Sequence, residues 1–107
     1  MREHAAGSHL SPTVYLQNNF ALDRGEMIWF TLQLEVYDEG DWHPVLRCDT
    51  AHNEAHLDYI DPQGENYRKE WLGATPPYNS THTQLVDDLE ANYQAHIDRW
   101  YRQKEAS

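Results

Sequence analysis

The stretch Met27-Ile-Trp-Phe-Thr-Leu-Gln-Leu-Glu-Val-Tyr37 decides the fold class, because large apolar residues alternate along it with polar ones. In an extended strand successive side chains point to opposite faces, so every second residue shares a face. One face would carry polar residues, and the other would carry only apolar ones: Ile28, Phe30, Leu32, Leu34 and Val36. The pattern predicts a strand with one face in the core.

Shorter strand-like segments lie on both sides of this central strand. Thr13–Phe20 is rich in strand-forming residues and predicts a first, edge strand, while Trp42–Asp49 predicts the antiparallel partner of the central strand. A second pair, Leu57–Ile60 and Asn66–Leu72, is joined by Asp-Pro-Gln-Gly, and proline and glycine at these positions favour a tight turn. The sequence therefore predicts an antiparallel meander of four or five strands.

The last part of the chain predicts one amphipathic helix from Thr81 to about Gln103. Thr81 and Gln84 stand at the spacing of a capping box, in which each side chain binds a free backbone N–H of the first turn. On a helical wheel the apolar residues fall in one continuous arc: Leu85, Val86, Leu89, Tyr93, Ile97 and Trp100. We expect this arc to pack on the apolar face of the sheet, which makes an α+β fold.

The 107 residues are enough for one domain. Residues 1–12 show neither a helical nor a strand period, so we expect them to form a flexible N-terminal arm. A single α+β domain over residues 13–107 follows from the elements above.

The charge of the chain limits its partners. Eight Lys and Arg stand against 18 Asp and Glu, a formal net charge of −10, which argues against general binding of nucleic acid or anionic membrane. The longest apolar run, Met27–Phe30, is far shorter than the roughly 20 residues of a membrane span. We expect a soluble, cytoplasmic protein, and the lone cysteine, Cys48, fits a reducing compartment. No glycine-rich phosphate loop is present, so no cofactor is expected.

The segment from Arg47 to Asp58 holds the densest group of residues able to do chemistry. If it is a loop that runs into a strand, His56 and Asp58 share one face, and Asp49 and His52 converge on that face from the preceding turn. These four residues would offer two imidazole nitrogens and two carboxylates to Zn²⁺ or another first-row ion. The simpler interpretation is a set of polar residues on an exposed sheet face.

Two neighbouring side chains in this segment also have two interpretations each. Arg47 lies inside an otherwise apolar strand, and we expect it to pair with Asp49 or Asp58 over the open face of the sheet; the alternative is a clamp for an anion. Cys48 is expected to be a small buried residue, and the alternative is a nucleophile with one of the nearby histidines as its base.

The stretch Val45-Leu-Arg-Cys-Asp-Thr-Ala-His-Asn-Glu-Ala-His56 resembles the V-x-R-Y-D-N-A-H core of a group of small uncharacterised bacterial proteins. More distantly, residues 27–72 resemble the TumE-like toxins of toxin–antitoxin pairs. The resemblance singles out Arg47, Asp49, His52 and His56 as candidate catalytic residues. The resemblance to the toxins implies a small α+β protein that acts on RNA and is neutralised by a partner.

Three functions therefore compete. The first is a non-catalytic module that binds a protein partner, or a second copy of itself, through an exposed aromatic or acidic surface. The second is a toxin-like ribonuclease with His52 and His56 as acid and base and Arg47 beside the phosphate. The third is a protein that binds a divalent metal through Asp49, His52, His56 and Asp58. The net charge favours the first, because an RNA-binding site concentrates positive charge.

Overall fold

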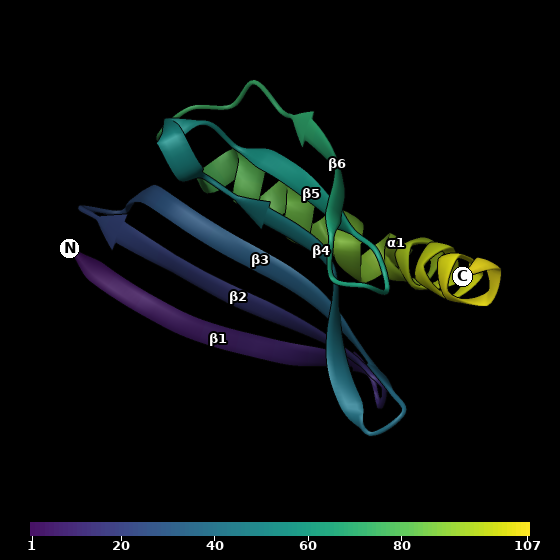
Figure 1. Cartoon of the computed structure of the whole chain (residues 1–107). Helices are drawn as coiled ribbons and strands as arrows, with labels where there is room; N and C mark the ends of the chain where they lie inside the picture. The colour runs from purple at the N-terminus through teal and green to yellow at the C-terminus, as the bar shows by residue number, and fades with distance from the viewer.

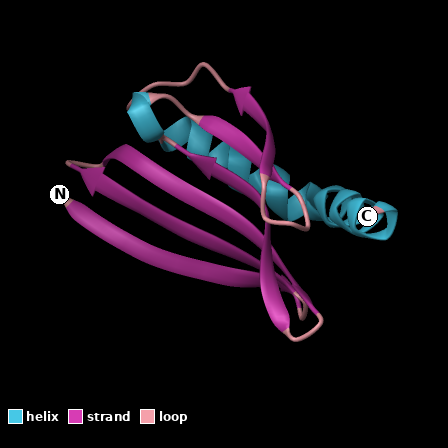
Figure 2. Cartoon of the chain, in the orientation of Figure 1, coloured by secondary structure: helices cyan, strands magenta, loops and turns pink.

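One antiparallel sheet and one helix make up the computed structural model, which describes residues 1–107. Each strand pairs with its neighbours in the chain, and the helix lies across one face of the sheet (Figures 1 and 2). The α+β class, the meander and the C-terminal helix are confirmed, but the sheet has six strands where the sequence predicted four or five. The strands are β1 (Arg2–Ser11), β2 (Val14–Asp23), β3 (Glu26–Asp38), β4 (Asp41–Asp49), β5 (His56–Ile60) and β6 (Asn66–Trp71).

The central strand β3 forms as its alternation predicts. Four of its apolar side chains are at most 1% exposed: Phe30, Leu32, Leu34 and Val36. At the start of the strand, Met27 is buried and Ile28 is only half-buried. The register with β2 shifts there, from Ala21 opposite Trp29 to Leu22 opposite Met27, so Ile28 is an extra residue that breaks the alternation.

The predicted flexible N-terminal arm is instead the additional strand, β1, so that prediction is wrong. β1 pairs with β2 from Arg2 opposite Leu22 to Ser8 opposite Leu16, which makes β1 the edge strand in place of β2. Most β1 side chains are exposed, so the segment shows no apolar alternation even though it pairs with β2 along its length. Gly7 leaves room for the ring of Tyr15, because a Cβ there would overlap the ring in its present position.

The predicted hairpin between β5 and β6 is present. Gly64 donates its backbone N–H to the carbonyl of Asp61 at 2.9 Å and adopts φ +83°, a conformation that favours glycine. The side chain of Asp61 accepts hydrogen bonds from the backbone of Gln63 and Glu65 at 3.0 and 2.9 Å. The turn is therefore held by both backbone and side-chain contacts.

The helix α1 spans Asn79–Ala106, longer than predicted at both ends. The expected capping box does not form: no side chain caps the first turn, and Gln84 donates to the Ser80 hydroxyl within the helix. Asn79 instead ties the helix start to the sheet, since its Oδ1 accepts from the backbone N–H of Met27 at 2.9 Å and its Nδ2 donates to the carbonyl of Gly25 at 3.0 Å. This long-range contact sets the helix start.

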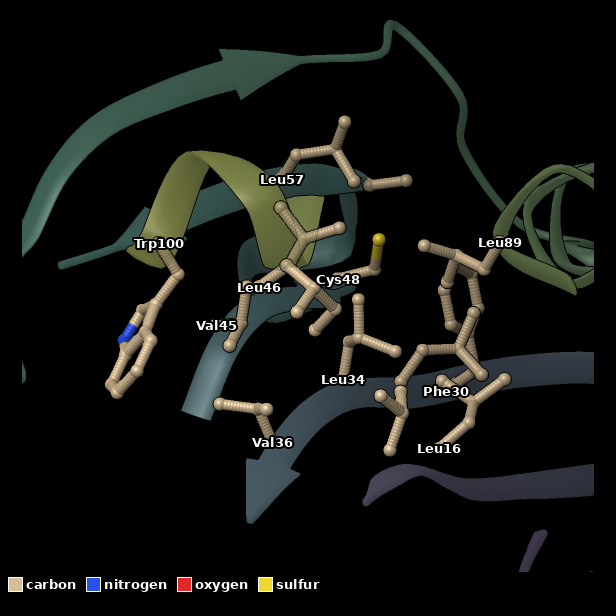
Figure 3. Packing of buried hydrophobic residues seen from close by; sticks show 14 of the residues in the cluster. Leu16, Phe30, Leu34, Val36, Val45, Leu46, Cys48, Leu57, Leu89 and Trp100 are labelled. Carbon is tan, nitrogen blue, oxygen red and sulfur yellow. The ribbon is translucent and has the colours of Figure 1, made fainter. Parts of the chain in front are cut away.

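The core lies between α1 and the apolar face of the sheet (Figure 3). From the helix, Leu89, Ile97 and Trp100 are buried, and Tyr93 packs against them half-buried. From the sheet, the buried residues of β3 meet Val45, Leu46 and Cys48 of β4 and Leu57 of β5. The predicted face of the helix is therefore the one that packs on the sheet.

A polar contact joins the end of α1 to the turn after β3. The carboxylate of Asp38 accepts hydrogen bonds from Lys104 and from the Tyr101 hydroxyl. The hydrogen bond from Lys104 is the main cause that lowers the pKa of Asp38 below its ordinary value of 3.8. The charged form of this carboxylate is therefore favoured by folding.

Replacing Asp38 with asparagine tests this contact. Because folding lowers the pKa, Asp38 contributes stability above the unfolded-state value near 3.8, and the contribution is lost as pH falls through the lower folded-state value. We expect Asp38→Asn to cost about 0.5–1 kcal/mol near neutral pH, as exposed ion pairs do, and almost nothing in strong acid. Urea unfolding of both proteins at the two pH values measures the difference. An equal difference at both would contradict an electrostatic role.

Candidate functional site

The register of the sheet assembles a polar band on the face opposite the helix. Residues directly opposite one another on paired antiparallel strands point to the same face. One row across β3, β4, β5 and β6 is Gln33, Arg47, Asp58 and Lys69, and the next row is Thr31, Asp49, His56 and Trp71. The candidate residues of the sequence thus become neighbours through strand pairing.

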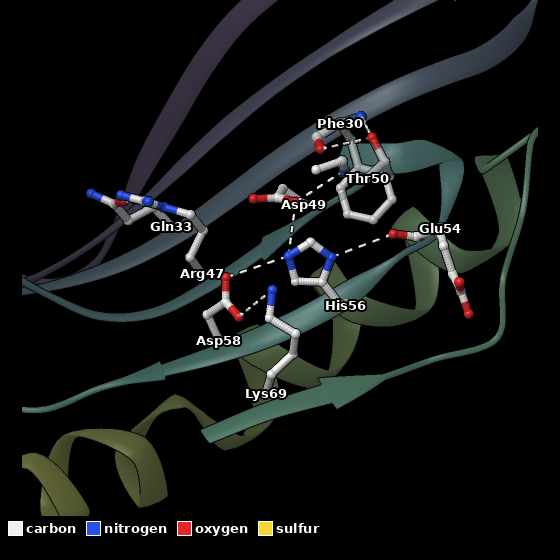
Figure 4. A network of polar contacts seen from close by, with 10 residues as sticks. Phe30, Gln33, Arg47, Asp49, Thr50, Glu54, His56, Asp58 and Lys69 are labelled. Carbon is white, nitrogen blue, oxygen red and sulfur yellow. Dashed lines mark hydrogen bonds and ion pairs between the residues drawn. The ribbon is translucent and has the colours of Figure 1, made fainter. Parts of the chain in front are cut away.

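His56 lies between two carboxylates (Figure 4). Its Nε2 is 3.0 Å from Oδ1 of Asp49 and 3.4 Å from Oδ2 of Asp58. One ligand-type atom from each of the three residues lies within 4.8 Å of the others, so a single ion could contact all three. We call these three residues the Asp-His-Asp cluster.

The cluster is largely shielded from water. His56 is only 3% exposed, and the ring of Trp71 lies over it with 5.1 Å between centroids. The Asp58 side chain is 12% exposed and that of Asp49 is 24% exposed. Access from solvent is therefore greatest on the Asp49 side, and the electrostatic interactions within the cluster are weakly screened.

Contacts outside the cluster hold both carboxylates in place. Oδ1 of Asp49 accepts the backbone N–H of Ala51 at 3.1 Å. Asp58 divides its two oxygens, with Oδ2 towards His56 and Oδ1 3.6 Å from the ammonium group of Lys69. The 3.6 Å separation leaves Oδ1 without a hydrogen bond. The two carboxylates of the cluster therefore have one lysine ammonium group, that of Lys69, near them.

The contact that Nδ1 of His56 makes bears on what Nε2 can bind. Nδ1 lies 3.4 Å from the backbone carbonyl of Glu54, which accepts a hydrogen bond in the tautomer that has its hydrogen on Nδ1. In the neutral ring this places the lone pair of Nε2 towards the carboxylates of Asp49 and Asp58. Three acceptors facing one another are stabilised only by a proton on Nε2 or by a cation between them.

His52 does not join the cluster, contrary to its predicted place in the metal set. Thr50 follows β4 and binds the backbone of Phe30 through its hydroxyl, and the chain then turns through the short helix η1 (Ala51–Asn53). Within η1, His52 has φ +61° and is exposed, while His56 is buried on the next strand. The reversal of the chain in η1 separates the two histidines that their spacing would have placed together on a helix.

Arg47 and Cys48 are the other two residues that the sequence singled out. Arg47 is exposed and donates Nε–H to Oε1 of Gln33 at 2.9 Å, so the predicted pairing with a carboxylate of the cluster does not form. Cys48 lies on the helix side, in the core. Burial, together with the charges of Asp49 and Asp58, raises the pKa of its thiol far above the ordinary value, so it is a packing residue and not a nucleophile.

Lys69 and Trp71 also belong to the site, although neither was among the site residues predicted from the sequence. Both lie on β6, whose pairing with β5 shifts register between Tyr59 and Ile60. Strand alternation alone could have placed Lys69 and Trp71 on a common face. The register shift, which nothing in the sequence marks, decides that they stand opposite Asp58 and His56.

Comparison with known proteins places the chain in a family. The model of a domain of unknown function, DUF7718, matches residues 1–106, so the chain belongs to the DUF7718 family. No curated protein and no solved structure matches the chain. The structure also has no helix whose length and apolar character would let it span a membrane.

Proposed function

We propose that this protein binds a divalent cation through Asp49, His56 and Asp58. The observation that supports this most directly is the convergence of one imidazole nitrogen and two carboxylates from two neighbouring strands. His56 would bind through Nε2, which faces the two carboxylates, and Nδ1 would then donate to the Glu54 carbonyl. Such a bond from the non-ligating nitrogen fixes the ring and is the usual companion of a histidine ligand.

The separations in the cluster suit a small ion. Ligand atoms about 2.1 Å from a metal lie about 3.0 Å apart in octahedral and about 3.4 Å apart in tetrahedral geometry. Nε2 of His56 is 3.0 Å from the nearest Asp49 oxygen and 3.4 Å from the nearest Asp58 oxygen. The two imidazole–carboxylate separations therefore suit a bound ion already, and the carboxylates would close around it from within the 4.8 Å that spans the three ligand atoms.

The donor set favours a first-row divalent ion such as Zn²⁺ or Mn²⁺. One imidazole and two carboxylates suit these ions better than Cu⁺, which prefers sulfur, and better than Ca²⁺, which prefers oxygen alone. Three protein ligands also leave a position for water or a substrate, as catalytic metal sites do. The site lies beside the exposed Arg47, a donor for an anionic ligand.

The toxin-like ribonuclease proposal has less support from the contacts. It requires His52 and His56 to act together on one phosphodiester, and His52 stands apart on η1. A protein-binding role does not depend on this cluster. The metal site is therefore the function that the geometry of the Asp-His-Asp cluster favours most.

Equilibrium dialysis of the purified protein against Zn²⁺ and Mn²⁺, followed by metal analysis, tests the proposal. We expect one ion per chain for at least one of the metals. Removing a carboxylate ligand with Asp49→Asn should weaken binding by at least the roughly 10- to 100-fold that loss of an outer-shell partner costs. Affinity should also fall as pH drops, because protons compete for the imidazole.

The chain contains a matched control in His52, an exposed histidine four residues before His56. We expect His52→Ala to bind metal like the wild type and His56→Gln to lose binding, with circular dichroism confirming that both fold. Equal loss in the two histidine variants would place the metal elsewhere. The absence of stoichiometric Zn²⁺ or Mn²⁺ in the wild type would refute the proposal.

A further inference from the structure

A group of aromatic rings lies on the same open face of the sheet, at the end near the β3–β4 turn and away from the Asp-His-Asp cluster. His9 of β1, Tyr15 of β2 and Trp42 of β4 surround a hollow of about 240 Å³ whose remaining lining residue is Glu35 of β3. Trp42 is 40% exposed. Large aromatic side chains gathered on an open surface in this way commonly mark a binding site.

The rings form walls and not a stack. His9 and Tyr15 meet edge to face with centroids 4.9 Å apart, and Tyr15 and Trp42 meet edge to face at 6.2 Å. His9 lies 5.8 Å from Trp42 with its plane tilted by 54°. Rings inclined in this way line the hollow with aromatic surface from three strands, and aromatic faces attract organic cations.

The carboxylate in the hollow adds charge to this arrangement. Oε2 of Glu35 accepts hydrogen bonds from Gln17 at 2.9 Å and Gln33 at 2.7 Å, which fix its position. Oε1 takes no hydrogen bond from the protein, so it is free to face a ligand. A net charge of −10 further raises the local concentration of cations around the molecule.

Two neighbouring residues support the walls of the hollow. The Tyr15 ring fits over β1 only because residue 7 is glycine, since a Cβ there would overlap it. Tyr37 stands opposite Trp42 in the strand pairing and meets its ring at 5.3 Å. The aromatic walls are therefore held by the fold itself and are in place before a ligand arrives.

We propose that the hollow formed by His9, Tyr15, Glu35 and Trp42 binds an alkylammonium group. Aromatic faces and a carboxylate together recognise such a cation through cation–π attraction and charge, while the apolar ring surface accepts its carbon atoms. The group can belong to a lysine side chain of a partner protein or to a free small amine. This site is independent of the metal proposal, because the two share no residue.

Binding is measured by following the Trp42 indole N–H resonance in ¹H–¹⁵N NMR spectra, identified by its absence from Trp42→Phe. The titrants are tetramethylammonium, its uncharged analogue tert-butanol, and a short peptide whose only charged side chain is lysine or trimethyl-lysine. The buffer contains a metal chelator, so that the metal site does not contribute. We expect the cations, but not the uncharged analogue, to shift the resonance with saturation.

Variants assign the binding to the hollow. Exposed-site cation–π contacts are worth about 0.5–1 kcal/mol each, so we expect Trp42→Ala to weaken binding by about two- to fivefold. Glu35→Gln removes the carboxylate charge and should weaken binding by a similar factor. Trp71→Ala, which removes another exposed tryptophan at the metal cluster, is the matched control and should leave affinity unchanged. Retention of affinity in both Trp42→Ala and Glu35→Gln would refute the assignment.

The ligands separate the two sources of the cation. Binding of the lysine or trimethyl-lysine peptide supports a protein partner, and binding of tetramethylammonium alone supports a free amine; both retain the alkylammonium assignment. Binding of the uncharged analogue as tightly as tetramethylammonium would overturn it, because the site would then recognise apolar surface and not charge.

Discussion

Replacing Trp100 with alanine should lower the free energy of unfolding by about 3–5 kcal/mol, the usual cost of removing a large aromatic side chain from a core. Trp100 is 1% exposed and is the largest fully buried side chain of the protein. It packs with Tyr101 at 5.1 Å and His43 at 5.3 Å between ring centroids. Alanine would leave a cavity at the junction of α1 and β4. Urea denaturation followed by circular dichroism measures the loss.

Trp100→Phe separates the volume of the side chain from its polar atom. The indole nitrogen of Trp100 is buried without a hydrogen-bond partner, so removing it breaks no hydrogen bond. We expect phenylalanine to keep most of the packing and to cost clearly less than alanine. A cost for Trp100→Ala below about 0.5 kcal/mol, the range of surface substitutions, would show that the helix does not pack as described.

Leu89→Ala should cost about 2–5 kcal/mol, the range for a buried leucine. Leu89 is 3% exposed and belongs to the same core cluster as Phe30 and Leu16. It lies nearly three helical turns before Trp100, so it tests whether the first half of α1 is held as firmly as the second.

The adjacent residue Glu90 is exposed and supplies the control for Leu89. We expect Glu90→Ala to change the unfolding free energy by no more than about 0.5 kcal/mol. If Leu89→Ala and Glu90→Ala had the same small effect, the face of the helix assigned to the core would be wrong. Both variants are compared with the wild type by urea denaturation at one pH.

Elements with a regular apolar pattern could be predicted from the sequence. β3 and α1 each bury one face, so the two-residue and 3.6-residue periods appear directly in their residues. β1 buries almost none of its side chains and is held by backbone hydrogen bonds to β2, which any residue except proline can make. Such a strand has no side-chain pattern by which to recognise it.

The candidate site was partly predictable for the same reason. His56 and Asp58 are two residues apart on a strand, so their common face follows from alternation, and Asp49 comes beside them because β4 and β5 form an antiparallel pair. The exclusion of His52 depends on the left-handed backbone of η1, which histidine adopts rarely. The partner of Arg47 depends on a choice among several nearby acceptors, which spacing alone does not decide.

The order of the strands also has a consequence for how fast the chain can fold. Every strand pairs with its neighbours in the chain, so each pairing closes only a short loop and costs little chain entropy. The contacts of α1 are different: Arg99 donates to the carbonyl of Val45, 54 residues away, and Asn79 binds Met27 across 52 residues. Docking of the helix is therefore the step that closes the longest loops and costs the most chain entropy. The rate of folding should respond to substitutions at these contacts between α1 and the sheet more than to changes in the β1–β2 hairpin.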